Sequence, residues 1–263
     1  MTSVQTEYGQ LVYSKLEGGK EILLAFHGFG QSKDVFTDWQ KNLCQRYTIY
    51  AFDLFNHGES SRSYGSLSKQ EWKAYLVQFL EKEGIDRFDV LGYSLGGRFA
   101  IASALGLPDQ TRKIILVAPD GVFLTPWFKL ATNPTVKWLF KYFMLRPEKL
   151  EAFMHFSSKT KLVNPYIIDF VKKEMGDATN RKRVYVSWNH FKSLGYSKKQ
   201  LIQLFSQHTF SKHLILGDRD RIIKPDKILP IIQRMGNFDM HILPLKHHQL
   251  VNQDVVKLIA KIP

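Results

Sequence analysis

The seven residues Leu91-Gly92-Tyr93-Ser94-Leu95-Gly96-Gly97 decide which fold we predict for this 263-residue chain. The apolar-rich run before them, residues 87–91, is typical of a buried strand, and the small and apolar residues 98–105 after them are typical of a buried helix. The flanking glycines allow a sharp strand-to-helix turn, because a Cβ there would collide with the neighbouring strand or helix. Such a turn lifts the Ser94 hydroxyl clear of the sheet and directs the N–H of Leu95 toward a developing oxyanion. Ser94 is therefore a candidate nucleophile; the alternative is a serine in a glycine-rich packing turn.

Strands and helices alternate on both sides of this unit. Alternating or dense apolar runs predict strands at residues 8–16, 21–26, 47–53 and 114–118. Residues 34–45 predict a helix, and Ser68 and Glu71 form a capping box that opens another helix ending near Glu83. This alternation predicts an α/β fold with a mostly parallel, doubly wound sheet covered on both faces.

The alternation stops between residues 120 and 209. Aromatic segments with helical spacing occupy this stretch, at residues 136–145, 147–155, 165–175 and 181–191. The sheet pattern returns with a strand at 213–216, a helix at 225–235, a strand at 238–243 and a last helix from about residue 254. We therefore expect a core of residues 1–119 and 210–263, with 120–209 inserted as a helical cap over the C-terminal edge of the sheet.

Polar residues that could activate Ser94 follow the two late strands. A serine nucleophile needs a base to take its proton and a carboxylate to orient that base. Catalytic groups of such sheets gather beyond the carboxyl ends of the strands, where these candidates would meet Ser94. The candidates are Asp218 and Asp220 for the acid, and His247 and His248 for the base.

A glycine-rich bend follows the strand at residues 21–26. It reads His27-Gly28-Phe29-Gly30, and such a bend can present a backbone N–H into a cleft. The N–H of Phe29 and the N–H of Leu95 would together form a two-amide oxyanion hole.

Taken in order, these motifs resemble those of the α/β-hydrolase superfamily, and the resemblance covers most of the chain apart from the cap. The matching pieces are His27-Gly28-Phe29-Gly30, Asp53 with His57-Gly58-Glu59-Ser60, Gly92-Tyr93-Ser94-Leu95-Gly96-Gly97, Gly217-x-x-Asp220 and the C-terminal histidine. The resemblance implies the α/β-hydrolase fold, with Ser94 as nucleophile, Asp220 as orienting acid, and Phe29 and Leu95 as oxyanion donors. By the same resemblance, His27 and His57 occupy structural turn positions.

The base is the main departure from the family pattern. Family members usually have Gly-His where this chain has Lys246-His247-His248. The family spacing from Asp220 favours His248, with His247 in the place of the glycine, and His247 stays the alternative.

The acid also has alternatives. The Gly-x-x-Asp spacing favours Asp220 over Asp218. Asp120 is a further candidate, since some relatives place the acid after the earlier strand.

The run that ends in Arg98 carries a second, weaker resemblance. Gly-Tyr-Ser-Leu-Gly-Gly-Arg is similar to the menaquinone-pathway synthase branch, which eliminates pyruvate and uses an arginine here to bind a substrate carboxylate. Residues 117–121 lack the sequence usual in that branch after the strand.

These observations predict a serine hydrolase that cleaves an ester, thioester or related acyl bond of a small apolar substrate, with an anionic group on it as an option. The alternatives are a carbon–carbon bond hydrolase or a pyruvate-eliminating lyase with the same triad, and a degenerate hydrolase that acts as a binding protein. No cofactor or metal is expected, because the histidines show no metal-ligand spacing.

Composition limits the setting of the protein. The formal net charge is +13, and residues 121–200 carry fifteen Lys and Arg against five Asp and Glu. Such a cluster attracts an anionic substrate, a membrane surface or nucleic acid, or is a solvated basic face; no nucleic-acid fold signature accompanies it. A single cysteine, Cys44, excludes an internal disulfide, and the sequence lacks a signal-peptide core and any apolar run of membrane-spanning length. We expect a soluble cytoplasmic protein whose oligomeric state the sequence leaves open.

Overall fold

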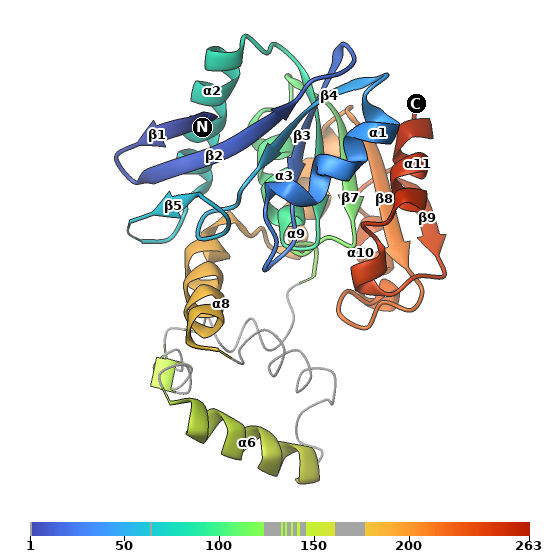
Figure 1. Ribbon diagram of the computed structural model, residues 1–263. Helices are drawn as coiled ribbons and strands as arrows, with labels where there is room; N and C mark the ends of the chain where they lie inside the picture. The colour runs from blue at the N-terminus through green and yellow to red at the C-terminus, as the bar shows by residue number, and fades with distance from the viewer. Residues whose placement is uncertain are drawn as a thin grey trace. The chain divides into compact units, whose positions relative to one another are not determined.

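The computed structural model describes residues 2–63, 65–123, 133, 135, 138, 141–142, 146–160 and 177–263 (Figure 1). The chain divides into two compact units, one made of Met1–Phe123 and Ser193–Pro263 and the other of Leu124–Lys192. The helix expected at 165–175 and most of the one expected at 136–145 lie outside the described residues.

A nine-stranded sheet forms the first unit, with the strand order β1-β2-β4-β3-β6-β7-β8-β9 and β5 paired with β2. The strands from β4 to β9 in this order are all parallel, and β1 and β2 join antiparallel at one edge. The prediction of a mostly parallel α/β sheet is therefore confirmed, while β1 was not expected. The bounds are β1 Thr2–Thr6, β2 Gly9–Leu16, β3 Glu21–Phe26, β4 Tyr47–Phe52, β5 Ser61–Arg62, β6 Phe88–Tyr93, β7 Thr111–Val117, β8 Ser211–Gly217 and β9 Asp239–Leu243.

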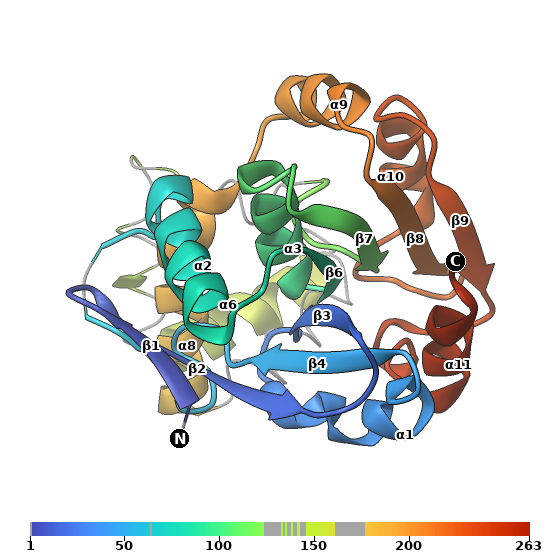
Figure 2. The ribbon, with the colours of Figure 1, turned by 90° about the horizontal axis from the view of Figure 1, so that it is seen from above.

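Helices cover both faces of this sheet. Figure 2 shows α1 and α11 on one face and α2, α3, α9 and α10 on the other. This double covering explains why the central strands β4 and β6 are buried along their whole length. The bounds are η1 Lys33–Trp39, α1 Gln40–Leu43, α2 Lys69–Glu83, α3 Gly96–Gly106, η2 Lys192–Leu194, α9 Lys198–Gln207, α10 Pro225–Ile232, η3 His247–Gln249 and α11 Gln253–Lys261.

Local sequence sets the ends of α2. The Ser68 hydroxyl accepts a hydrogen bond from the Glu71 N–H at 3.1 Å, and the Glu71 carboxylate accepts one from the Ser68 N–H at 2.7 Å. The helix ends at Gly84, whose φ of 65° is the left-handed conformation that glycine adopts most easily. The capping box is thus confirmed, whereas the single helix expected at 34–45 is instead a 3-10 helix followed by the four-residue α1.

Aromatic side chains fix α2 and α3 to the sheet. Phe26 of β3 lies 5.5 Å from Trp72 of α2, and Trp72 meets Phe99 of α3 edge-to-face at 5.0 Å between ring centroids. All three side chains are fully buried. Such pairs add about 1 kcal/mol each beyond the burial of area, so the sheet is a rigid platform for the loops at its carboxyl edge.

Two described helices lie in the second unit, α6 Pro147–Thr160 and α8 Ala178–Phe191. The carboxylate of Asp177 caps α8 by accepting a hydrogen bond from the Asn180 N–H at 2.9 Å. Among the described residues of this unit there is no strand. The unit is narrower than the expected insertion at 120–209, since α9 belongs to the first unit, and the placement of a cap over the sheet edge stays a prediction.

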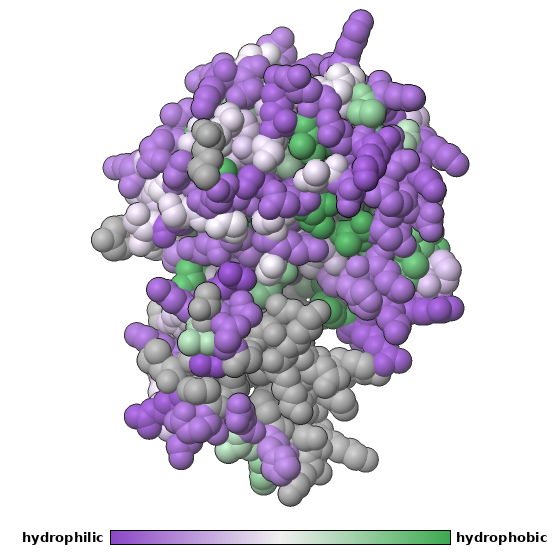
Figure 3. Space-filling model, viewed as in Figure 1, coloured by the Kyte–Doolittle hydropathy of each residue, from purple (hydrophilic) through white to green (hydrophobic). Residues whose placement is uncertain are grey.

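The surface of the first unit is mostly hydrophilic on the face that Figure 3 presents. In the part of the chain that the structure describes, no helix combines the length and the apolar character that a membrane crossing requires.

Candidate active site

The turn between β6 and α3 holds Ser94 in a strained backbone conformation. Its φ is 50°, a left-handed value that is uncommon for a residue other than glycine. Three hydrogen bonds fix this peptide: the Ser94 N–H donates to the Val117 carbonyl at 3.0 Å, and the Ser94 carbonyl accepts from the N–H groups of Gly97 at 2.9 Å and Asp120 at 2.8 Å. The surrounding structure therefore over-determines the position of the serine.

The glycines of this turn are required by close approach. A Cβ on Gly92 would lie 2.4 Å from the Gly96 carbonyl oxygen, and a Cβ on Gly96 would lie 2.0 Å from the Phe26 carbonyl oxygen. Both distances are far below van der Waals contact, so the steric reason predicted for the two flanking glycines is confirmed.

Three side chains from distant parts of the sequence meet at this turn. The Ser94 Oγ lies 2.9 Å from Nε2 of His247, and Nδ1 of His247 lies 2.6 Å from Oδ2 of Asp220. Because a carboxylate only accepts, Nδ1 carries the proton and Nε2 is left to accept the proton of the Ser94 hydroxyl. The contacts form one continuous hydrogen-bonded path from hydroxyl to carboxylate.

The carboxylate of Asp220 is itself held in place. Its side chain is fully buried, and its Oδ1 accepts hydrogen bonds from the N–H groups of Ile222 and Ile223, each at 2.8 Å. Its Oδ2 is thereby aimed at His247, as the choice of Asp220 for the orienting acid requires.

The choice of His248 for the base is corrected by this geometry. His247 makes both contacts, whereas His248 is the exposed next residue of the short turn η3. β9 ends at Leu243, as the sequence predicts, and the 3-10 turn that begins at His247 brings the first of the two imidazoles, not the second, to the Ser94 hydroxyl. Lys246 has a φ of −81° and a ψ of 163°, an extended conformation open to any residue, so this position does not need the glycine that relatives have.

The two other acid candidates are occupied elsewhere. Asp218 has a side chain 54% exposed and lies 3.9 Å from Nε of Arg219. Asp120 accepts two hydrogen bonds from Arg98, at 2.7 Å from Nε and 3.1 Å from a terminal nitrogen. Sequence reasoning considered Asp120 and Arg98 separately and missed this pair, although their positions after β7 and in α3 are both in the motifs.

The predicted oxyanion donors lie at the ends of β3 and β6. The Gly28 carbonyl interacts with Nδ1 of His27 at 2.7 Å and accepts a hydrogen bond from the Gln31 N–H at 3.3 Å. A trans peptide places the next N–H, that of Phe29, on the opposite side of this carbonyl. Within the described chain, neither the Phe29 N–H nor the Leu95 N–H has a hydrogen-bond partner. Their joint role at an oxyanion stays a prediction.

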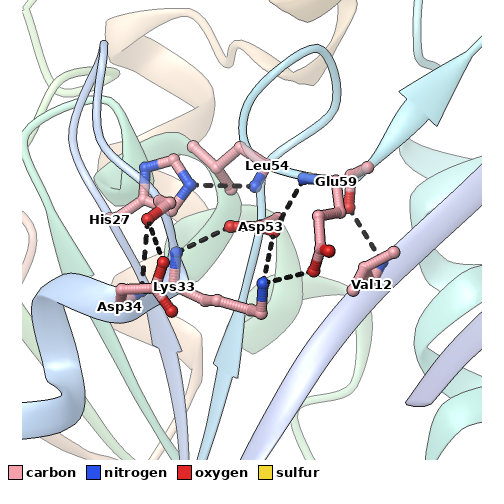
Figure 4. A network of polar contacts seen from close by, with 9 residues as sticks. Val12, His27, Lys33, Asp34, Asp53, Leu54 and Glu59 are labelled. Atoms are coloured by element: carbon pink, nitrogen blue, oxygen red, sulfur yellow. Dashed lines mark hydrogen bonds and ion pairs between the residues drawn. The ribbon is translucent and has the colours of Figure 1, made fainter. Parts of the chain in front are cut away.

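A polar network behind this loop connects it to the loop after β4 (Figure 4). The buried Asp53 carboxylate accepts hydrogen bonds from the Lys33 N–H at 2.7 Å, the Lys33 ammonium at 3.0 Å and the Glu59 N–H at 2.9 Å. His27 Nε2 accepts from the Leu54 N–H at 3.0 Å, so Nδ1 carries the ring proton. Burial lowers the pKa of His27 to about 4, which leaves the ring neutral and structural.

No metal site accompanies these contacts in the described part of the chain. There, no group of three or more His, Cys, Asp or Glu side chains is placed to hold a metal ion.

Comparison with known proteins gives the class of the protein. The sequence model of the family described as "alpha/beta hydrolase fold" matches residues 21–252, and the chain belongs to this family. Among curated proteins, the chain is 33% identical over 112 residues to the dihydrolipoyllysine-residue acetyltransferase component of the acetoin cleaving system of Cupriavidus necator, a match that covers 41% of this chain and 29% of that protein. The matches to the first curated relatives span between 29% and 39% of the length of those proteins.

Solved structures resemble the chain over nearly its whole length. A thermophilic esterase from Thermogutta terrifontis has a TM-score of 0.72 at 17% identity, with 98% of this chain and 97% of that chain covered. A meta-cleavage product hydrolase from Pseudomonas fluorescens has a TM-score of 0.68 at 15% identity, with 99% and 96% covered. At these identities the likeness establishes the α/β-hydrolase fold alone.

Proposed function

We propose that this protein is a serine hydrolase that cleaves an ester, thioester or related acyl bond of a small molecule. Ser94 is the nucleophile, His247 the base and Asp220 the acid that orients the base. The observation that carries the proposal is the unbroken path of 2.9 Å and 2.6 Å contacts from the Ser94 hydroxyl through His247 to Asp220. Membership of the α/β-hydrolase family supports a hydrolase in general.

The first half of the reaction forms an acyl-enzyme. His247 Nε2 takes the hydroxyl proton as Ser94 Oγ attacks the acyl carbon, and the carbonyl oxygen gains the negative charge. The Leu95 and Phe29 N–H groups donate to this oxyanion. The bond to the leaving group then breaks, and the leaving alkoxide or thiolate receives the proton from His247.

The second half releases the acid product. A water molecule loses a proton to His247 and attacks the acyl carbon, and the bond to Ser94 Oγ breaks as His247 returns the proton to that oxygen. Asp220 stays ionised throughout, holds the ring in the Nδ1–H tautomer and stabilises the imidazolium.

Probe labelling and one matched pair of variants test the assignment. A fluorophosphonate probe should label the parent at Ser94, identified by peptide mass spectrometry, and Ser94→Ala should remain unlabelled. With a p-nitrophenyl ester of short chain, Ser94→Ala and His247→Ala should each lose about a thousandfold or more in kcat/KM.

The variant His248→Ala is the control, because it removes the neighbouring exposed imidazole. It should keep kcat/KM within about twofold of the parent, since His248 has no place in the path. Equal losses in His247→Ala and His248→Ala would refute the assignment of the base. An unlabelled parent with no esterase activity would refute the serine hydrolase and favour a binding protein.

The carbon–carbon bond hydrolase is the second candidate. It is favoured by the likeness to the meta-cleavage product hydrolase, whose fold the chain shares. Turnover of a vinylogous diketone with Ser94-dependent release of a carboxylic acid from the acyl half and an enol or ketone from the other half, at a kcat/KM above that for aryl esters, would select this reaction over ester cleavage.

The pyruvate-eliminating lyase has less support. The Arg98 side chain is only 1% exposed and forms two hydrogen bonds with Asp120, which opposes a role in binding a substrate carboxylate. Incubation with the enoyl-ketoacid intermediate of the menaquinone pathway tests the lyase hypothesis, and release of pyruvate would support it.

A further inference from the structure

We propose that Tyr93 is a positioning residue that holds the turn carrying His247 against the strand carrying Ser94. The inference rests on the proposed function, because the role of Tyr93 is to position His247, the proposed base. Tyr93 is the last residue of β6, and the nucleophile is the next residue of the chain.

The contacts of Tyr93 reach two other loops of the site. Its hydroxyl donates a hydrogen bond to the main-chain carbonyl of His247 at 3.0 Å, and the two rings lie 5.3 Å apart between centroids at an angle of 31°. On the loop that follows β3, a Cβ added to Gly28 would lie 2.8 Å from Cε1 of Tyr93. The side chain is 4% exposed, so it packs between the base and the loop of Phe29.

The turn that carries His247 needs such an anchor. It is a 3-10 helix of three residues, and the hydrogen bonds between its own main-chain groups are local: Gln249 N–H to the Lys246 carbonyl at 3.0 Å, and Leu250 N–H to the His247 carbonyl at 3.2 Å. These bonds shape the turn but do not fix it relative to β6. The Tyr93 hydroxyl fixes the turn relative to β6, because Tyr93 belongs to β6 and its hydroxyl is a second hydrogen-bond donor to the His247 carbonyl.

The surroundings of the Tyr93 hydroxyl keep it protonated. Burial, reinforced by the negative charge of Asp220, raises the pKa of the Tyr93 phenol above its usual value. The hydroxyl therefore remains a hydrogen-bond donor at neutral and mildly alkaline pH.

The first test compares two isosteric substitutions. Tyr93→Phe keeps the ring and removes the hydroxyl, and we expect kcat for a p-nitrophenyl ester to fall about tenfold with KM unchanged, as the loss of one buried hydrogen bond predicts. Tyr75→Phe is the matched control, because the Tyr75 hydroxyl donates to the buried Gly9 carbonyl at 3.2 Å, away from the site. It should lower stability comparably and leave kcat unchanged. A Tyr93→Phe protein with the kcat of the parent would overturn the inference.

The second test separates positioning from a general structural role. In a His247→Ala background, Tyr93→Phe should cause no further loss of the residual esterase activity, since the group that it positions is gone. A tenfold loss in both backgrounds would overturn the inference. As a second readout, the downfield NMR signal of the His247 Nδ1 proton should broaden or shift in folded Tyr93→Phe and stay unchanged in Tyr75→Phe; an unchanged signal in both would overturn it.

The outcomes also separate this inference from the function on which it rests. A parent that no fluorophosphonate labels would remove the proposed function. A labelled, active parent with an equally active Tyr93→Phe variant would leave the function standing and remove only the role of Tyr93.

Discussion

His27 should make the stability of this protein fall steeply in mild acid. The ring is fully buried, its Nε2 accepts a hydrogen bond from the Leu54 N–H, and burial lowers its pKa to about 4. Protonation of Nε2 would place two donors face to face, whereas in the unfolded chain the same ring protonates freely near pH 6.5. Since the unfolded chain takes up this proton at a higher pH than the folded chain, the contribution of His27 to stability is complete above pH 6.5 and is lost as the pH falls toward 4.

The size of the effect follows from the two pKa values. Between them, His27 contributes a slope approaching 1.36 kcal/mol per pH unit, and a drop from pH 8 to pH 5 should cost about 2 kcal/mol of unfolding free energy. This is a large share of the about 5–15 kcal/mol that stabilises an ordinary domain.

Urea unfolding of the parent and of His27→Asn at pH 8, 7, 6 and 5 measures this contribution. Asparagine keeps a donor near the Gly28 carbonyl but does not titrate, so the variant should be less stable at pH 8 and should lose less stability on acidification. The difference between the two proteins removes the contributions of other groups, such as His213, whose pKa burial also lowers. A difference in unfolding free energy that stays constant from pH 8 to pH 5 would refute the reasoning.

Two further predictions concern the frame of the site. Gly96→Ala places a Cβ 2.0 Å from the Phe26 carbonyl oxygen, and because the Cβ is fixed to its backbone and the carbonyl belongs to a central strand, the elbow must shift; we expect a loss of about 3 kcal/mol or more in urea unfolding, and a loss below about 1 kcal/mol would contradict the steric argument. Asp120→Ala leaves the Arg98 guanidinium buried without its carboxylate and should cost about 3 kcal/mol, whereas Asp218→Ala, at a half-exposed side chain, should change stability by no more than about 0.5 kcal/mol; equal effects would count against the buried pair.

The elbow and the sheet could be predicted because their sequence patterns are local. The glycine at position 92 is demanded by Gly96 of the same turn, whereas the glycine at position 96 is demanded by the Phe26 carbonyl of the neighbouring strand β3, a close approach that the elbow motif implies wherever it sits in such a sheet. The apolar runs of β3, β4, β6 and β7 are buried wherever a doubly covered sheet forms. Ser94 and Asp220 follow from the same logic, since each is placed by a motif directly after a strand.

The pair of Arg98 and Asp120 could not be predicted in this way. Each residue belongs to a recognisable motif and suggested a function of its own: Arg98 would bind a substrate carboxylate, and Asp120 would be the catalytic acid. Their contact depends on the path of the chain after β7, where Gly121 has a φ of 102° and a Cβ there would lie 2.9 Å from the Arg98 side chain. Spacing along the sequence carries no information about this close approach.

The choice between His247 and His248 shows that sequence spacing can locate the base only to within one residue. Both residues follow β9, so the sequence places either of them at the correct edge of the sheet, but successive side chains of a 3-10 turn point in directions about 120° apart. Which one reaches Ser94 is set by where β9 ends and by how the turn is anchored, and the anchor includes the Tyr93 hydroxyl on a strand more than 150 residues earlier in the chain. Family spacing alone therefore cannot assign the base. Deletion of one residue between Leu243 and Lys246 would move His248 into the place of His247, and a transfer of catalytic dependence from His247 to His248 in that variant would demonstrate this control directly.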